Sequence, residues 1–461
     1  MSGIIYKTLK ENAEKYGDKP AILYDTIEVS YSKLYRDAVK KALHLQRFEG
    51  ERIALYGPAS YRWIVNMFGI LLSGKDLIIT DFFAPQNIRK KMLRKTNANY
   101  VLTATNQYIL STADETIIPG ADKDDTDGLI YDENTKLGKI IMFTATRLRN
   151  DKPFVVEESS ICHAIDVINT VIECEPEDKL LSQIPLHKAF GLIYALLWPL
   201  FNGACVCIGR GLRHIDADTH YYHPTILPAT PSMIGYLKKV KAFNEELNTV
   251  VIGAGFVPFR ILEELRDRNI KAYSVYGRSE ACSAIAINET IDGSYKILDK
   301  DSVSISDTGE ILYKGDCCMV EYLDDREASD EIFEGGVMHT GDHGRINTEG
   351  KLVVNSPNPD VILFPTGEEL SRNAVMLDIE AINGIAECYV TYYEEKLTLL
   401  LRPVNKDIRR ELLLKKIDKY NEQMGYRWEI QKSIILDEQI PKCEDGNFDE
   451  DAIKEIIVNQ Q

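Results

Sequence analysis

The sequence reads Gly309-Glu-Ile-Leu-Tyr-Lys-Gly315, continues after a spacer with Phe333-Glu-Gly-Gly-Val-Met-His-Thr-Gly-Asp342, and then reaches Gly350-Lys-Leu352. Short apolar runs alternate with glycines throughout this stretch. Glycine adopts the positive φ angles of tight turns without a steric penalty, so the pattern predicts short strands joined by turns. We therefore expect a small β unit, a β-barrel, from about Ile305 onward.

Upstream of this stretch, apolar runs of strand length alternate with helical patterns. The predicted helices include 30–45, capped at Ser32, together with Tyr61–Ser73 and Pro258–Arg268. The predicted strands form two groups: Arg52–Gly57, Leu77–Thr80, Tyr100–Leu102 and Lys139–Phe143, then Cys205–Ile208, Ile226–Pro228, Val250–Ile252 and Ala272–Val275. This alternation predicts an α/β fold with two sheet subdomains.

A proline-rich segment separates this large part from the rest of the chain. Ser356-Pro-Asn-Pro-Asp360 holds two prolines, which interrupt regular structure. We expect an N-terminal domain over 1–355, a hinge over 356–360 and a small α+β domain over 361–461. In the last of these we expect a hairpin at Glu394-Glu395 and a helix near Lys406–Met424.

The composition of the 461 residues predicts a folded protein. Hydrophobic residues make up 44% and charged residues 27%, and Lys plus Arg total 54 against 71 Asp plus Glu. The resulting charge of −17 argues against general attraction to nucleic acid or anionic membranes. No long apolar span or signal peptide is evident, which favours a cytoplasmic protein without an integral membrane segment. The 9 cysteines lack a CxxC pair, and we interpret them as structural thiols.

Four further motifs, together with the glycine-rich stretch, resemble the adenylate-forming acyl-activating superfamily. They are Tyr276-Gly-Arg-Ser-Glu280, Ile184-Pro-Leu-His-Lys-Ala-Phe-Gly191, Pro228-Ala-Thr-Pro231 and Gly253-Ala-Gly255. The superfamily contains acyl-CoA synthetases, aryl-CoA ligases, peptide-synthetase adenylation domains and luciferase. The resemblance implies activation of a small carboxylic acid by ATP as an acyl-adenylate, followed by transfer to a thiol of CoA or of an acyl-carrier protein.

The resemblance also implies a nucleotide site. Glu280 would hold Mg²⁺, Asp342 would accept both ribose hydroxyls and Tyr276 would flank the adenine, with Gly277 and Ser279 in the same motif. A carboxylate suits the first two roles, as a hard oxygen ligand and as an acceptor with two oxygens. Without the surrounding motifs, Glu280 would be interpreted as an acid at a helix start and Asp342 as a turn residue.

The phosphate loop expected of the family departs most from its pattern. It falls on Phe143-Thr-Ala-Thr-Arg-Leu-Arg-Asn-Asp-Lys-Pro153, which keeps Thr144 and Lys152 but has no glycine. Glycines normally let backbone N–H groups close around phosphates. Arg147 and Arg149 offer a guanidinium clamp as a substitute, or else form a solvated basic loop.

Three other family motifs carry different residues. Lys188 stands where a histidine assists adenylation, while His187 is interpreted as a packed or hydrogen-bonded residue. Pro357 replaces a nucleotide-binding arginine, and Pro359 falls near the pivot of domain rotation. Asn447 replaces the catalytic lysine of the C-terminal motif; nearby Lys442 is interpreted as an exposed lysine at a strand end.

A polar cluster unrelated to these motifs spans His214-Ile-Asp-Ala-Asp-Thr-His220-Tyr-Tyr-His223. Its imidazoles and carboxylates suit a zinc site by residue type, but the spacing matches no metal motif. We interpret them as solvated polar residues of a surface loop and helix.

Three functions remain open from the sequence. The first is an acid–thiol ligase, with Glu280, Lys188 and Lys152 as catalytic residues and with impaired turnover. The second is a pseudoenzyme that binds a nucleotide, an acyl-adenylate or a partner protein. The third is a protein that uses a preformed acyl-adenylate and needs no grip on pyrophosphate.

Overall fold

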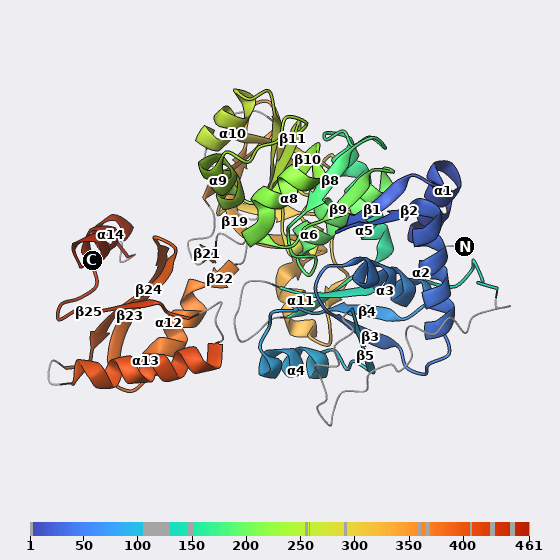
Figure 1. Ribbon diagram of the computed structural model, residues 1–461. Coiled ribbons are helices and arrows are strands. Elements are labelled where there is room, and N and C mark those ends of the chain that lie inside the picture. Colours follow the sequence, from blue (N-terminus) through green and yellow to red (C-terminus); the bar gives the residue numbers. More distant parts are fainter. Residues whose placement is uncertain are drawn as a thin grey trace. The chain divides into compact units, whose positions relative to one another are not determined.

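The computed structural model describes residues 3–104, 130–144, 152–253, 257, 259–289, 293–356, 361–364, 369–405, 408–424, 429–442 and 448–460. They form two compact units, one holding the described residues up to Ser356 and the other those from Val361 onward (Figure 1). The predicted hinge therefore lies outside the described residues, except for Ser356 at the end of a strand.

The first unit contains a six-stranded sheet. Its order is β17 (Glu321–Tyr322), β7 (Pro153–Val156), β6 (Ile140–Phe143), β4 (Asp76–Ile79), β3 (Arg52–Tyr56) and β5 (Tyr100–Thr103). The four strands from β6 to β5 are parallel. The four strands predicted for the first group are thus confirmed to within one or two residues.

Helices cover both faces of this sheet. Along β3, Ile53 and Leu55 pack into the core that contains α3 (Tyr61–Leu72), while Ala54 packs on the side of α4 (Gln86–Lys95). Figure 1 shows α3 and α4 on opposite faces. The alternation follows from the strand period of two, and it explains why these strands have continuous apolar sequences.

The second sheet of this unit has 14 strands. Its parallel part is β1 (Pro20–Tyr24), β9 (Cys205–Ile208), β8 (Lys179–Ser182), β10 (Ile226–Ala229), β11 (Thr249–Ile252) and β12 (Lys271–Tyr276), with β2 (Ile27–Ser30) antiparallel at one edge. The antiparallel part is β13 (Ala286–Asn288), β14 (Ser294–Ile297), β20 (Leu352–Ser356), β19 (Val337–Ile346), β16 (Glu310–Tyr313) and β15 (Val303–Ile305), with β18 (Phe333–Glu334) on β19.

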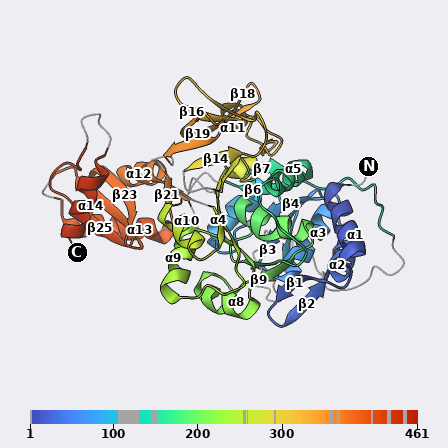
Figure 2. The ribbon, with the colours of Figure 1, turned by 90° about the horizontal axis from the view of Figure 1, so that it is seen from above.

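The antiparallel part corresponds to the predicted small β unit. Figure 2 shows β14, β16, β18 and β19 together with α11 (Arg326–Ile332). The described strands of this unit do not close into a barrel, and β13 and β14 join the unit to the parallel part of the sheet. This refines the expectation of a separate barrel: the β unit extends the second sheet.

Other helices of this unit flank the sheets. They are α1 (Ile4–Tyr16), α2 (Tyr31–Leu45), α5 (Glu158–Asn169), α6 (Ala189–Leu192), α7 (Trp198–Phe201), α8 (Ile215–Tyr222), α9 (Pro231–Val240) and α10 (Phe259–Arg266). The predicted cap of α2 at Ser32 is wrong: Ser30 is the cap, because its Oγ accepts from the Lys33 N–H at 3.3 Å. Ser32 instead donates to the Ala13 carbonyl.

The second unit is a small α+β layer. Its three-stranded sheet is β23 (Ile385–Tyr393), β24 (Lys396–Pro403) and β25 (Lys432–Ile435). One face packs on α12 (Arg372–Glu380) and α13 (Arg410–Met424), and the other on α14 (Glu450–Asn459); β21 (Val361–Leu363) and β22 (Glu369–Ser371) form a separate pair. The predicted hairpin is confirmed, with Glu394 and Glu395 at φ of 47° and 63° in the turn.

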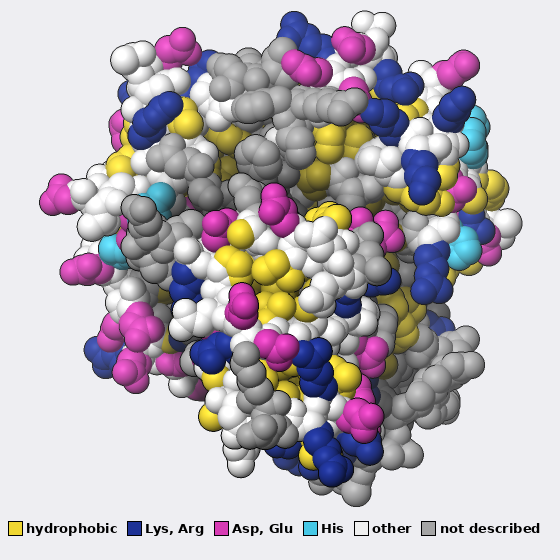
Figure 3. Space-filling view, turned by 90° about the vertical axis from the view of Figure 1, so that its left-hand side faces the viewer, with side chains coloured by type: hydrophobic (Ala, Val, Ile, Leu, Met, Phe, Trp, Pro, Cys, Tyr) yellow, Lys and Arg dark blue, Asp and Glu magenta, His cyan; other side chains and the backbone are white. Residues whose placement is uncertain are grey.

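The length of the helices and the charges on the surface are relevant to membrane association. No helix in the described ranges is long and apolar enough to cross a bilayer. The face drawn in Figure 3 carries acidic and basic side chains interspersed over the surface. The cytoplasmic location stays a prediction from the sequence.

Candidate functional site

The predicted ribose-binding residue Asp342 lies in an irregularity of β19. Glu310 of β16 pairs with His343, and Leu312 pairs with His339, so β19 holds two more residues than β16 between these pairs. Gly341 takes φ of 72° there, and its N–H donates to Glu310 Oε1 at 2.9 Å. Bulges of this kind re-aim side chains, which explains why a glycine precedes Asp342.

Tyr276, the last residue of β12, contacts Asp342 in the middle of β19. The Tyr276 hydroxyl donates to Asp342 Oδ2 at 3.0 Å, although the residues lie 66 positions apart in the chain. Burial, together with the Asp342 carboxylate, raises the pKa of Tyr276 above its ordinary value, so the phenol remains a donor at neutral pH. A phenol ring beside an oriented carboxylate suits an aromatic base joined to a diol-bearing sugar.

Gly277 has a packing role that the sequence motif did not reveal. A Cβ at this position would lie 2.5 Å from the carbonyl carbon of Ser283. The glycine therefore allows β12 to approach the turn that follows the short 3₁₀ helix Ser279–Ala281. The 3₁₀ helix itself carries Glu280, and Ser279 is its first residue.

Glu280 is buried, with 4% of its side chain exposed. Its Oε1 accepts a hydrogen bond from the Tyr322 hydroxyl at 2.8 Å, and the same oxygen lies 3.6 Å from Nη2 of Arg278. Nη1 of Arg278 donates to the Thr340 carbonyl oxygen at 2.7 Å, which links the guanidinium to the strand of Asp342. The carboxylate is thus neutralised by a cation of its own motif.

This arrangement does not fit the expected Mg²⁺ ligand. Mg²⁺ demands near-octahedral oxygen geometry and retains several waters. The buried Glu280 carboxylate instead has a phenol and a guanidinium against one oxygen, and a cation beside Arg278 would face like charge. The residues beside Glu280 therefore suit an anion better than a divalent cation.

Thr144 and Lys152 close a hairpin. The Thr144 N–H donates to the Lys152 carbonyl and the Lys152 N–H donates to Thr144 Oγ1, both at 3.1 Å. The Lys152 ammonium lies 3.9 Å from Asp325 Oδ2 and 5.2 Å from the centre of the Tyr322 ring. Tyr322 thus lies between Lys152 and Glu280, while Arg147 and Arg149 fall outside the described residues.

The short strand β17 explains how Tyr322 reaches this position. Tyr322 pairs with Phe154 of β7, next to the Lys152 hairpin. Just before β17, the Met319 N–H donates to the Glu280 carbonyl oxygen at 2.6 Å. One segment therefore ties the six-stranded sheet to the turn of Glu280.

The other predicted residues are placed differently. Lys188 precedes α6 and is partly exposed, and in the described part of the chain no hydrogen bond or ion pair joins it to Glu280 or Asp342. His187 Nδ1 lies 3.8 Å from Asp81 Oδ1. In the second unit, Lys442 contacts Glu387 at 2.7 Å and lies over the Phe448 ring, as suits a structural lysine, while Asn447 lies outside the described residues.

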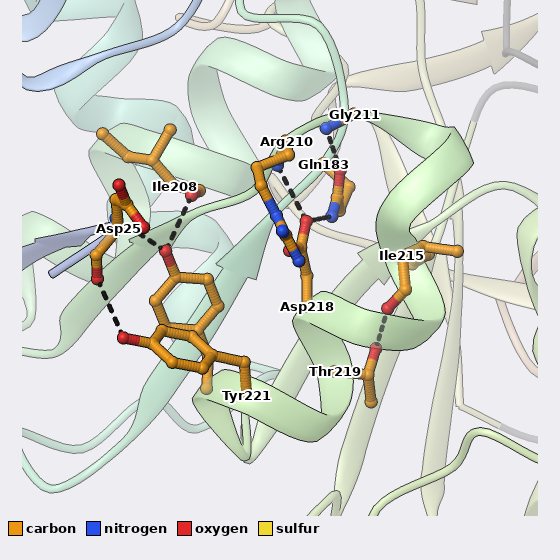
Figure 4. A network of polar contacts seen from close by, with 10 residues as sticks. Asp25, Gln183, Ile208, Arg210, Gly211, Ile215, Asp218, Thr219 and Tyr221 are labelled. Atoms are coloured by element: carbon orange, nitrogen blue, oxygen red, sulfur yellow. Dashed lines mark hydrogen bonds and ion pairs between the residues drawn. The ribbon is translucent and has the colours of Figure 1, made fainter.

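The polar cluster at 214–223 is a structural network (Figure 4). Asp218 is fully buried, and it accepts from Gln183 Nε2, the Arg210 N–H and Arg210 Nε, each at 2.7 Å. Our interpretation of solvated residues is wrong for Asp218, because it faces the sheet from α8. His214, His220 and His223 are exposed, and no metal-binding group of three ligands occurs in the described ranges.

Two residues of the site were missed by the sequence analysis. Arg278 lies inside the quoted motif, where its charge beside Glu280 was an available signal. Tyr322 lies 42 positions from Glu280 in a segment without a recognised motif, so nothing in the sequence indicated it.

Comparisons with known proteins agree with this architecture. The family described as AMP-binding enzyme matches residues 9–151 and 150–323. The chain is 22% identical to 2-succinylbenzoate–CoA ligase of Bacillus subtilis, covering 84% of this chain and 85% of the relative. It is 23% identical to D-alanine–D-alanyl carrier protein ligase of Staphylococcus aureus, covering 99% and 100%.

Solved structures share the fold. The o-succinylbenzoate CoA synthetase of Bacillus subtilis, bound to a product analogue, superposes with a TM-score of 0.80 at 18% identity and covers 97% of this chain and 98% of its own. A protein with peptide-synthetase adenylation and carrier domains also gives 0.80, at 16% identity, with coverage of 99% and 84%.

Proposed function

Because the chain belongs to the family of AMP-binding enzymes, we propose that it is a divergent acid–thiol ligase. In this proposal it holds a carboxylic acid as its adenylate and presents the acyl group to a thiol. ATP would supply the AMP group when bound, and the step that forms the adenylate is the impaired one.

The observation that carries the proposal is the Tyr276–Asp342 pair. The two residues are joined at 3.0 Å, and the bulge in β19 sets the direction of the carboxylate. A partly exposed carboxylate accepts from two hydroxyl groups of a ribose, and the neighbouring phenol ring gives the base an apolar wall.

The proposed acid substrate and thiol acceptor are based on the names of two relatives. One relative is named as a CoA ligase of an aromatic carboxylic acid, and another as a ligase of D-alanine to a carrier protein. We propose the shared chemistry, a small carboxylic acid transferred to CoA or to the thiol of an acyl-carrier protein.

Two measurements test the proposal. Calorimetric titration with AMP and with a non-hydrolysable acyl-adenylate analogue should show saturable binding. Asp342→Ala should weaken AMP binding about 10- to 100-fold, because hydrogen bonds to a charged group contribute about 1.5–3 kcal/mol. Asp307→Ala, which changes an exposed acid of a nearby turn, is the control. Unchanged AMP affinity in Asp342→Ala would refute the proposed site.

A second candidate is an adenylate-binding pseudoenzyme. It is favoured by the contacts of Glu280 with Arg278 and Tyr322. The residue that the resemblance assigns to the metal ion thus contacts donors of the protein instead. Exchange of labelled pyrophosphate into ATP, measured with a broad panel of acids, separates the candidates. Exchange supports the ligase, whereas AMP binding without exchange supports the pseudoenzyme.

A further inference from the structure

The guanidinium of Arg278 contacts Glu280 and the backbone of β19, the strand that carries Asp342. It approaches Glu280 Oε1 to 3.6 Å and donates to the carbonyl oxygen of Thr340 at 2.7 Å, two residues before Asp342. About a quarter of the Arg278 side chain is exposed, at 23%. A positive charge is thus held against the strand of the predicted ribose-binding acid, and a guanidinium is suited to bind a phosphate attached to that ribose.

The surroundings hold this charge in place. The Tyr322 hydroxyl fixes the Glu280 carboxylate at 2.8 Å, and Glu280 in turn faces Arg278. Tyr322 itself is held by its pairing with Phe154 in β7. A guanidinium that is oriented in advance loses little side-chain entropy when it binds phosphate, and it binds phosphate oxygens through paired hydrogen bonds.

We propose that Arg278 takes the place of a divalent cation, so that the site binds a nucleoside monophosphate or its acyl ester without a metal ion. This inference rests on the proposed function, because it concerns the phosphate of the same nucleotide. Its ligand class is a phosphate of low charge next to a ribose. A triphosphate should bind more weakly than a monophosphate, because its additional negative charges would be repelled by Glu280 without a metal ion to screen them.

The test is calorimetric titration of the full chain with AMP, once with EDTA and once with Mg²⁺. A metal that takes no part in binding cannot change the affinity, so the two dissociation constants should agree within about twofold. Arg278→Ala should weaken AMP binding about 10- to 100-fold in both buffers through loss of charge-assisted hydrogen bonds. Arg326→Ala, which removes an exposed arginine on α11, is the matched control.

Glu280→Gln gives opposite results under the two alternatives. If Arg278 binds the phosphate, removing the neighbouring negative charge should tighten AMP binding by about two- to tenfold, whether or not Mg²⁺ is present. If Glu280 is a metal ligand, the same change should weaken binding in Mg²⁺. Thermal melting of each variant shows whether it is folded. If Arg278→Ala is not folded, Arg278→Lys replaces it in the titrations.

The outcomes separate this inference from the proposed function. AMP binding that requires Mg²⁺, or that weakens in Glu280→Gln, would overturn the inference and leave the proposed nucleotide site intact. Wild-type protein that is folded but binds AMP in neither buffer would overturn both.

Discussion

Replacing Asp218 by alanine should destabilise the first unit by about 2–6 kcal/mol, because two hydrogen-bond donors lose their acceptor at about 1–3 kcal/mol each. The carboxylate is fully buried and accepts three hydrogen bonds at 2.7 Å. Without it, the Gln183 amide and the Arg210 main-chain N–H lose their acceptor, and each unsatisfied buried donor costs about 1–3 kcal/mol. The Arg210 side chain is 54% exposed and exchanges its contact for water at smaller cost.

Urea unfolding followed by tryptophan fluorescence measures this loss, because Trp63 and Trp198 both belong to the core of the first unit. Asp216→Ala is the matched control. Asp216 and Asp218 both lie in the first turn of α8, so each loses a similar favourable interaction with the helix dipole, about 0.3–1 kcal/mol. The reasoning is refuted if Asp218→Ala costs no more free energy of unfolding than Asp216→Ala.

Three further predictions concern other parts of the chain. Gly277→Ala should lower the free energy of unfolding by about 1–3 kcal/mol, because the added methyl would meet the backbone of the following turn at 2.5 Å. Burial alone would raise the pKa of Glu387, but hydrogen bonds from Lys442 and other donors lower it. The stabilisation from Glu387 should therefore be present above about pH 4.3 and be lost as pH falls through the lower folded-state pKa, and an acid titration of thermal melting should show a flatter limb for Glu387→Gln. Replacing Glu394-Glu395 by Asn-Gly should stabilise the second unit by about 0.4–1 kcal/mol, because both positions have positive φ. The melting temperature of the second unit should rise accordingly.

Controls for these three changes come from the same chain. Gly235→Ala in α9, where the added methyl meets nothing within 4 Å, should be neutral or stabilising. An equal loss in Gly235→Ala and Gly277→Ala would contradict the packing argument. An acid limb unchanged by Glu387→Gln, or a lower melting temperature with Asn-Gly, would contradict the other two.

Much of the fold followed from local patterns. Apolar runs of strand length between helical patterns predicted the strands of both sheets, since a strand covered on both faces needs apolar side chains on both. The predicted β9 matches the structure at both ends, because Cys205–Ile208 is bounded by a glycine on one side and by Gly203-Ala204 on the other. The hairpin at Glu394-Glu395 was predictable for a similar reason, since its charged turn separates two apolar strands.

The sequence also predicted that Tyr276, Glu280 and Asp342 belong to one nucleotide site, because their motifs resemble those of the family, and this assignment stays a prediction. The sequence could not show what these acids contact. The partner of Glu280 comes from β17, and the aim of Asp342 depends on a bulge defined only by pairing with β16. The burial of Asp218 likewise depends on where α8 packs, so a polar helix face appeared solvated.

The amino-acid sequence thus determined the α/β architecture, the family and the residue types of the candidate site, since these depend on periodicity and on ordered motifs within short segments. Only the tertiary structure decided the charge of that site. Arg278 is only two residues from Glu280, but the contact of Glu280 with Tyr322 joins residues 42 positions apart in the chain, and it forms only when β17 lies beside the 3₁₀ helix of Glu280.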